Sequence, residues 1–262
     1  MTTIDAVLAR LSEAEQQLDD AEAPLSGWQL DPIYMGNQRL SRGDLDRVST
    51  TRPIEVLHAS GHILNVNTKA LSLSGLLKSG INHPGTPLDH EGLPTGELKG
   101  PEVMMSVAGY VGFDRSLTDA DAQGLQDFAK ICVRAGVTTV TDLASRLSDE
   151  TVEMMQIVTS AEDFSARLVP LKLFIGLSPK DLIARVGELA KLSTDRLRLG
   201  KIKIVADGSI QGFPARMRWS GYYNGAPNGL WYITPEQLSE IYHLALEAGV
   251  QVHTHINGDQ AI

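Results

Sequence analysis

The sequence between residues 118 and 255 alternates repeatedly between a helix signal and a strand signal. Each strand segment is short and rich in β-branched residues, and each helix segment repeats apolar residues every three or four positions. Helices that separate such strands are typical of βαβ units, whose strands pair in parallel. The expected strands are residues 137–141, 169–175, 201–206 and 250–255.

Capping residues mark where the expected helices begin and end. Thr118 and Asp121 form an acidic capping box, and Gly136 provides a left-handed stop. A second helix has Ser178 as its N-cap and Pro179 as its first residue. The third helix repeats the pattern, with its signals at Thr234, Pro235, Gln237 and Gly249.

These repeats predict an α/β fold, and a (β/α)8 barrel of the TIM type is favoured over a doubly wound sheet. No GxGxxG turn follows any expected strand, and such a turn is typical of doubly wound dinucleotide-binding sheets. The side chains at the carboxyl ends of barrel strands face the active site. Polar residues end several expected strands here, among them His58, Asp142, Asp207 and His255.

The region before residue 118 is less regular. We expect an amphipathic helix over residues 3–19, a loop-rich segment over 23–51, a buried strand over 54–57 and a helix over 65–77. Residues 80–99 are dense in Pro, Gly and Asp, so an inserted excursion near 80–117 could form a small hairpin over a site. We therefore divide the chain into a lead-in, 1–52, and a partial barrel, 53–262.

Composition excludes several classes of protein. The formal net charge is −9 and no long run of Lys and Arg occurs, which disfavours nucleic acid as a partner. The single cysteine, Cys132, permits no internal disulfide and no thiolate metal cluster. No signal peptide or membrane-spanning segment is evident. We expect a soluble, cytoplasmic protein without a membrane partner.

The segment that ends the chain contains an HxH motif. In a strand His253 and His255 point to the same face and Thr254 to the other, so both imidazoles could bind Zn²⁺ or a similar metal. The alternative is a pair of hydrogen-bonded structural histidines. The acid of the Gly258-Asp259 turn that follows favours the metal site.

Lys203 lies in an otherwise apolar strand, on the same face as Lys201. A lysine that points into a barrel must lose its charge, find a partner or be modified, because burial of an ammonium group is costly. Three uses fit: a carbamate that bridges two metals, a Schiff base with a carbonyl substrate, or a salt bridge to Asp207. The residues alone favour the salt bridge.

Two further segments are candidates for substrate contacts. His62 follows His58 across a Ser-Gly turn, where it could contact substrate or transfer a proton. The aromatic residues between Trp219 and Tyr232 form either a packed loop or the wall of an apolar substrate pocket. A packed loop is the more common use of such a segment.

Four segments together resemble the amidohydrolase 3 family, a group of the amidohydrolase superfamily that includes N-substituted formamide deformylases and YtcJ-like hydrolases. They are Ser60-Gly-His62 with Val66-Asn67-Thr-Lys-Ala-Leu, Ala135-Gly-Val-Thr-Thr-Val-Thr-Asp142, Lys203-Ile-Val-Ala-Asp207-Gly-Ser and His255-Ile-Asn-Gly-Asp259-Gln-Ala. The similarity extends from about Arg42 to the last residue, and the segments occur in the family's order.

The resemblance implies a distorted (β/α)8 barrel with one or two divalent metal ions, most simply zinc, that activate water to attack an amide or formamide carbonyl. Lys203 matches the lysine that is carboxylated to bridge the metals, and His255 matches a metal-binding histidine, with His253 less tightly constrained. His62 and Asp207 match positions near the substrate, a small-molecule amide. We assign Asp259, the acid of the His255 motif, to substrate binding as well.

The sequence also departs from the family pattern. Members begin with a β-rich domain and a first barrel strand that ends in an HxH metal pair, and finish with strands that supply another histidine and an aspartate. No histidine precedes Ile54, and the sequence stops at Ile262. We therefore expect a fragment with too few ligands for tight zinc binding, exposed strand edges that favour homo-oligomers, and doubtful activity. The rival readings are a Schiff-base lyase or aldolase that uses Lys203, and a catalytically dead scaffold.

Overall fold

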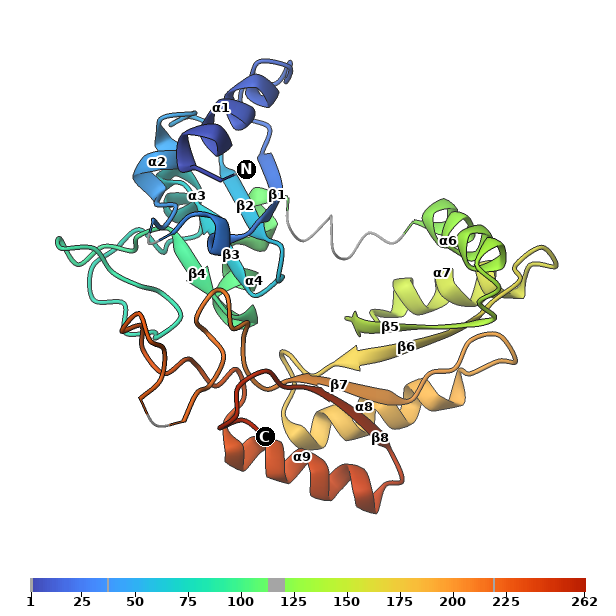
Figure 1. Ribbon diagram of the computed structural model, residues 1–262. Coiled ribbons are helices and arrows are strands. Elements are labelled where there is room, and N and C mark those ends of the chain that lie inside the picture. Colours follow the sequence, from blue (N-terminus) through green and yellow to red (C-terminus); the bar gives the residue numbers. More distant parts are fainter. Residues whose placement is uncertain (1, 37, 113–120, 219) are drawn as a thin grey trace. The chain divides into compact units, whose positions relative to one another are not determined.

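The computed structural model describes residues 2–36, 38–112, 121–218 and 220–262 (Figure 1). The chain divides into two compact units, described separately below. Unit 1 comprises Met1–Ser116, Asp207–Tyr232 and Ile256–Ile262, and unit 2 comprises Leu117–Ala206 and Ile233–His255. These boundaries differ from the expected division into a lead-in, 1–52, and a partial barrel, 53–262. That division of the chain stays a prediction.

Unit 1 contains a four-stranded mixed sheet in the order β1-β2-β3-β4. Its strands are β1 (Leu25–Leu30), β2 (Ile54–His58), β3 (Ile63–Val66) and β4 (Glu97–Lys99). β1 pairs with β2 in parallel, and the other two pairings are antiparallel. The expected strand over 54–57 is confirmed.

Two expectations for this region are wrong. The loop predicted over 23–51 contains β1, whose sequence LSGWQL buries only its first and last residues, so no apolar alternation is visible. The helix predicted over 65–77 starts later, because β3 continues to Val66 and the Asn67 side chain caps α3 (Thr68–Leu73) by accepting from the Ala70 N–H. The expected helix over 3–19 forms as α1 (Ile4–Glu15).

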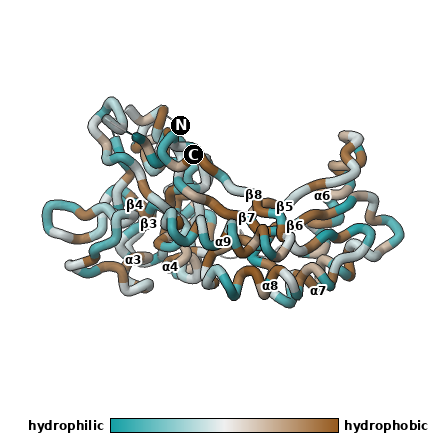
Figure 2. The backbone as a smooth tube through the Cα atoms, turned by 90° about the horizontal axis from the view of Figure 1, so that it is seen from below, coloured by the Kyte–Doolittle hydropathy of each residue, from teal (hydrophilic) through white to brown (hydrophobic). Residues whose placement is uncertain are grey.

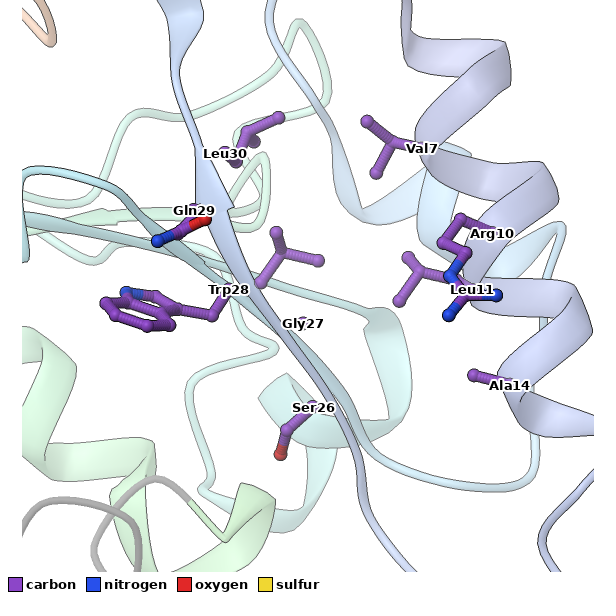
Figure 3. A pocket seen from close by; sticks show the side chains of 10 residues that line it. Val7, Arg10, Leu11, Ala14, Ser26, Gly27, Trp28, Gln29 and Leu30 are labelled. Atoms are coloured by element: carbon purple, nitrogen blue, oxygen red, sulfur yellow. The ribbon is translucent and has the colours of Figure 1, made fainter. Parts of the chain in front are cut away.

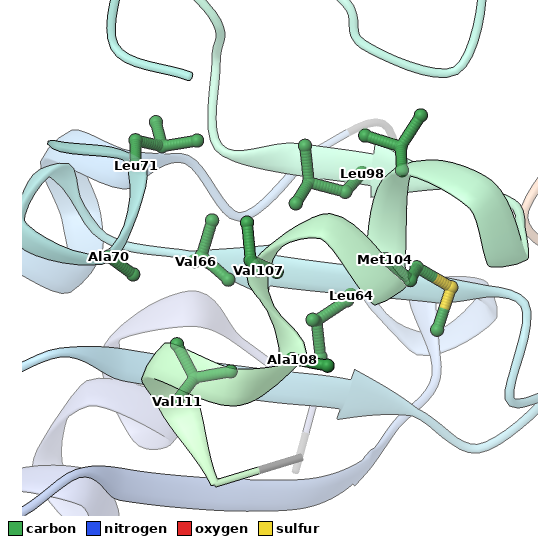
Figure 4. Close-up of a cluster of buried hydrophobic side chains, with 10 residues drawn as sticks. Leu64, Val66, Ala70, Leu71, Leu98, Met104, Val107, Ala108 and Val111 are labelled. Atoms are coloured by element: carbon green, nitrogen blue, oxygen red, sulfur yellow. The ribbon is translucent and has the colours of Figure 1, made fainter. Parts of the chain in front are cut away.

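Helices cover both faces of this sheet. α1, the 3-10 helix η1 (Pro32–Tyr34) and α2 (Arg42–Asp46) accompany β1 and β2, where a core forms around Leu8, Leu45 and Ile54. A second core lies between β3, β4, α3 and α4 (Pro101–Val111), the last of which the sequence did not reveal (Figure 4). Its fully buried side chains include Leu64, Leu71 and Leu98.

The expected excursion contains a small hairpin. Leu88 bridges Pro94 in antiparallel fashion, and the Asp89 N–H donates to the Leu93 carbonyl at 2.8 Å. The excursion was expected to extend to residue 117, but it rejoins the sheet at β4 and continues into α4. Residues 113–117 lie outside the described part of the chain.

Unit 2 contains a four-stranded sheet whose strands follow one another in sequence order and pair in parallel. The strands are β5 (Thr139–Ser145), β6 (Arg167–Leu173), β7 (Lys201–Val205) and β8 (Gln251–His255). The helices are α6 (Ala122–Arg134), α7 (Asp149–Ser160), α8 (Pro179–Lys191) and α9 (Pro235–Glu247). The predicted parallel α/β arrangement is confirmed.

Unit 2 is a series of consecutive βα units. Figure 2 shows α7, α8 and α9 on one side of the β5–β8 sheet. A doubly wound sheet reverses its strand order and places helices on both faces, whereas here the order never reverses. Within the described residues this sheet is open, with β5 and β8 at its edges, so a closed (β/α)8 barrel is not seen.

The predicted helix caps in unit 2 are mostly confirmed. Ser178 caps α8 by accepting from the Asp181 N–H, and Thr234 and Gln237 form a reciprocal capping box at α9. Asp121 alone caps α6, and its expected partner Thr118 lies outside the described residues.

Candidate functional site

Lys203, His253 and His255 lie on one face of the unit 2 sheet. Lys203 of β7 is directly opposite His253 of β8, and Val205 is opposite His255. The Thr254 hydroxyl lies 2.7 Å from the Tyr242 hydroxyl of α9, so the intervening residue points towards the helices. The two histidines therefore point away from the helices, as the strand alternation predicted.

Lys203 is a buried cation, since only 5% of its surface is exposed. Burial lowers the pKa of its ammonium group because the charged form loses solvation. Burial is the one cause of this shift, and among the described residues no charged or hydrogen-bonding partner of Lys203 contributes to it. By contrast, the Nζ of Lys201 on the same face donates to the side-chain oxygen of Gln251.

The donor set on this face fits part of a divalent-metal site. His253 is exposed and His255 is partly exposed. Across the described chain, no group of three or more His, Cys, Asp or Glu side chains is arranged to hold a metal. A catalytic zinc uses about three protein ligands, so this face reaches three only if Lys203 carries a carboxyl group.

Asp207 is fully buried in unit 1 and is used as a hydrogen-bond acceptor. Its Oδ2 accepts the backbone N–H groups of Arg216 and Gly258 at 2.8 and 2.7 Å, and its Oδ1 accepts that of Asn257 at 2.8 Å. A carboxylate with three such donors needs no cationic partner. Asp207 thus ties the 207–232 loop to the segment that begins at Ile256.

The other two predicted substrate residues also lie in unit 1. The exposed Asp259 accepts the Arg218 N–H at 3.0 Å. The centroids of the His62 and Tyr232 rings are 5.8 Å apart. The backbone carbonyl of His62 accepts the Gly100 N–H at 3.1 Å. The structure therefore places these residues in one unit and the three predicted metal ligands in the other.

Asp142 does not end its strand as expected. β5 continues to Ser145, and the Asp142 carboxylate accepts the Ala144 N–H at 3.1 Å. In the aromatic segment, Tyr222 donates to the Ala215 carbonyl at 2.8 Å and packs edge-on against Phe213, as in a packed loop. Trp219 lies outside the described residues.

Unit 1 also buries two ionisable residues of β2: Glu55, for which the sequence predicted no role, and His58, which was expected to end a strand facing the active site. Glu55 accepts the Ser26 hydroxyl at 2.8 Å, and burial raises the pKa of its carboxyl to about 7. Burial lowers the pKa of His58 to about 4. A glutamate and a histidine within the apolar segment Ile54–His58 were the available signal.

A cavity of about 430 Å³ lies between α1 and β1 in unit 1 (Figure 3). Val7 and Leu11 of α1 face Gly27 and Leu30 of β1 across it. Its one cation, Arg10, pairs with Glu13 at 3.0 Å. None of the predicted site residues lines this cavity.

The chain belongs to the amidohydrolase family, whose pattern it matches over residues 1–262. It is 27% identical over 274 aligned positions to "Putative amidohydrolase YtcJ" of Bacillus subtilis (strain 168), covering all of this chain and 49% of that protein. It is 24% identical to "Protein LONG AFTER FAR-RED 3" of Arabidopsis thaliana, covering 90% of this chain and 41% of that protein. The chain thus spans about half the length of the curated relatives it matches.

A solved structure supports the fold. An uncharacterized metal-dependent hydrolase from Pyrococcus horikoshii OT3 superposes with a TM-score of 0.53 at 18% identity, over 99% of this chain and 49% of that protein. This match is consistent with part of an amidohydrolase barrel. None of the helices in the described residues is long and apolar enough to cross a membrane.

Proposed function

We propose that this chain provides metal ligands to a hydrolase that cleaves C–N bonds other than peptide bonds, in a small linear amide or N-formyl compound. The observation that carries the proposal is the direct pairing of Lys203 with His253, with His255 on the same face. Membership of the amidohydrolase family supports it, as does the Pyrococcus horikoshii relative, which is called a metal-dependent hydrolase.

Lys203 has the chemistry required of a carboxylated lysine. Its lowered pKa increases the fraction of neutral amine, which is the form whose Nζ attacks CO₂. A C–N bond forms, one amine proton leaves, and the product carries two carboxylate oxygens in place of a buried positive charge. With the imidazoles of His253 and His255, these oxygens would hold the ion, which we propose to be zinc.

A bound zinc ion would supply Lewis-acid chemistry and activate water near neutral pH. We also propose that His62, Asp207 and Asp259, all in unit 1, take part in substrate binding. Because the Asp207 oxygens already accept three backbone N–H groups, its contribution is to shape the 207–232 loop.

The test is hydrolysis of a panel of N-substituted formamides and linear amides, with added zinc and with a chelator. Turnover is expected to require the metal and to be abolished in Lys203→Ala. The matched control is Lys201→Ala, which removes a lysine from the same strand face and should retain turnover. Equal rates in Lys203→Ala, or rates unaffected by the chelator, would contradict the proposal.

A second candidate is a Schiff-base lyase, favoured by the same lowered pKa of Lys203. Borohydride should then trap a covalent adduct between a carbonyl substrate and wild-type chain, and none with Lys203→Ala. A metal-dependent hydrolase should give no adduct. If neither turnover nor trapping is observed, the remaining reading is a catalytically inactive scaffold.

A further inference from the structure

A small cavity in unit 1 lies among the side chains of Arg39, His58 and Glu97. The volume that the centre of a water-sized sphere can occupy in this cavity is about 10 Å³. A single water molecule needs roughly 10–15 Å³ by the same measure. The cavity is therefore too small for a substrate and close to the size of one water molecule.

His58 presents a hydrogen-bond acceptor to this cavity. The Asn65 Nδ2 donates to the Leu40 carbonyl at 2.6 Å, which orients the Asn65 Oδ1 towards His58 Nε2, also at 2.6 Å. Nε2 must then carry the proton, and the lone pair of the neutral ring is on Nδ1. Nδ1 is buried and has no partner among the described protein atoms.

Arg39 presents the complementary donor. Its Nε and Nη2 donate to Glu97 Oε2 at 2.7 and 2.6 Å. Its Nη1 is buried and, within the described residues, has no acceptor. Burial, with a smaller contribution from the charge of Arg39, holds the pKa of His58 down against the opposing effects of Asn65 and Glu97. The ring is therefore neutral, and Nδ1 is available as an acceptor.

We propose that one water molecule binds in this cavity, accepting a hydrogen bond from Arg39 Nη1 and donating one to His58 Nδ1. An anion could accept from Arg39 but could not donate to His58, and a cation would be repelled by the guanidinium group. The water joins the His58–Asn65 pair to the ion pairs of Glu97 with Arg39 and Lys99. It thereby fixes the end of β2 that precedes the turn to His62.

The test is a high-resolution crystal structure of the full chain, together with ¹⁵N NMR of the His58 ring. The expected result is a water peak within hydrogen-bond distance of both Arg39 Nη1 and His58 Nδ1, with the ring proton on Nε2. An ordered cavity without such a peak, or a proton on Nδ1, would overturn the proposal.

Two variants distinguish the two ring nitrogens. His58→Gln places an amide nitrogen near the Nε2 position, so it preserves the bond to Asn65 but removes the acceptor. His58→Asn places an oxygen near the Nδ1 position and keeps the acceptor. The water should be lost in the first variant and retained in the second; any other distribution would show that Nδ1 does not hold it.

Discussion

At the scale of single residues, Asp207 and Asp259 follow strands in similar motifs but differ in their bonding. Replacing Asp207 by Asn would turn an amide NH₂ towards backbone N–H groups that now donate to a carboxylate. Since a buried donor left unsatisfied costs about 1–3 kcal/mol, we expect Asp207→Asn to lower the free energy of unfolding by roughly 2–4 kcal/mol. Urea denaturation measures this change.

Asp259→Asn is the matched control, because the exposed Asp259 accepts one N–H, from Arg218. An Asn side chain can accept that bond through its own oxygen, so the change should be within about 0.5 kcal/mol. Equal stability of the two variants would show that the hydrogen bonds of Asp207 do not hold unit 1 together.

The buried acid and base of β2 make opposite contributions to stability as pH changes. The pKa of Glu55 rises from 4.5 to about 7 on folding, so its contribution is lost as pH rises through that window. The pKa of His58 falls from 6.5 to about 4, so its contribution is lost as pH falls from 6.5 to 4. The two effects partly cancel between pH 4.5 and 6.5.

Glu55→Gln should reveal this cancellation. Relative to wild type, the variant should gain stability as pH rises from about 4.5 to 7, by up to roughly 3 kcal/mol, because each pKa unit corresponds to about 1.4 kcal/mol. Unfolding free energies of both proteins across this range provide the test. A difference that does not change with pH would mean that Glu55 titrates normally in the folded chain.

Some of these residue roles could be predicted from sequence and others could not. Strand alternation correctly places His253 and His255 on one face, and an apolar strand marks Lys203 as a buried cation. The expected Lys203–Asp207 salt bridge was the wrong use of Asp207, because its donors come from positions 9, 50 and 51 residues further along the chain. No local pattern identifies such donors.

At the scale of elements, local signals predicted the starts of α8 and α9, because capping depends on neighbouring residues, whereas α7, capped by Ser148, was not predicted. Local signals failed for β1, because Gly27 occupies a position where an apolar side chain would have indicated a strand. A β-carbon at Gly27 would lie 3.3 Å from Leu11 Cδ2 and 3.4 Å from Val56 Cγ2. The close approach of α1 to the strand therefore removes the side chain that would have marked it.

α8 contains a glycine that its packing does not require. A β-carbon at Gly187 would meet no atom within 4 Å, and glycine inside a helix costs about 0.5–1 kcal/mol relative to alanine. Gly187→Ala should therefore raise the stability of unit 2 by about that amount, as measured by thermal or urea unfolding.

Gly200→Ala is the corresponding negative control in unit 2. Gly200 has a φ of +94°, and a β-carbon there would lie 2.6 Å from Ala190 Cβ. This substitution should be destabilising. If both alanine variants shift stability in the same direction, the local geometry of these glycines does not determine the effect.

At the scale of the whole molecule, the chain carries a series of parallel βα units and a partial set of metal donors. The strand order, the position of α7, α8 and α9 on one side of the sheet and the family match support part of an amidohydrolase barrel. The sequence predicted these parallel units, since they arise from local periodicity. The division into two compact units could not be predicted, because unit 1 combines three separate segments of the chain.

The central claim is that the β7–β8 face of this chain holds a metal ion, and elemental analysis of the purified chain tests it most directly. After zinc loading, the account predicts bound zinc in wild type and in Lys201→Ala, and its loss in the Lys203→Ala, His255→Ala double variant. Absence of metal from wild type after zinc loading, or equal metal in the double variant, would contradict the claim.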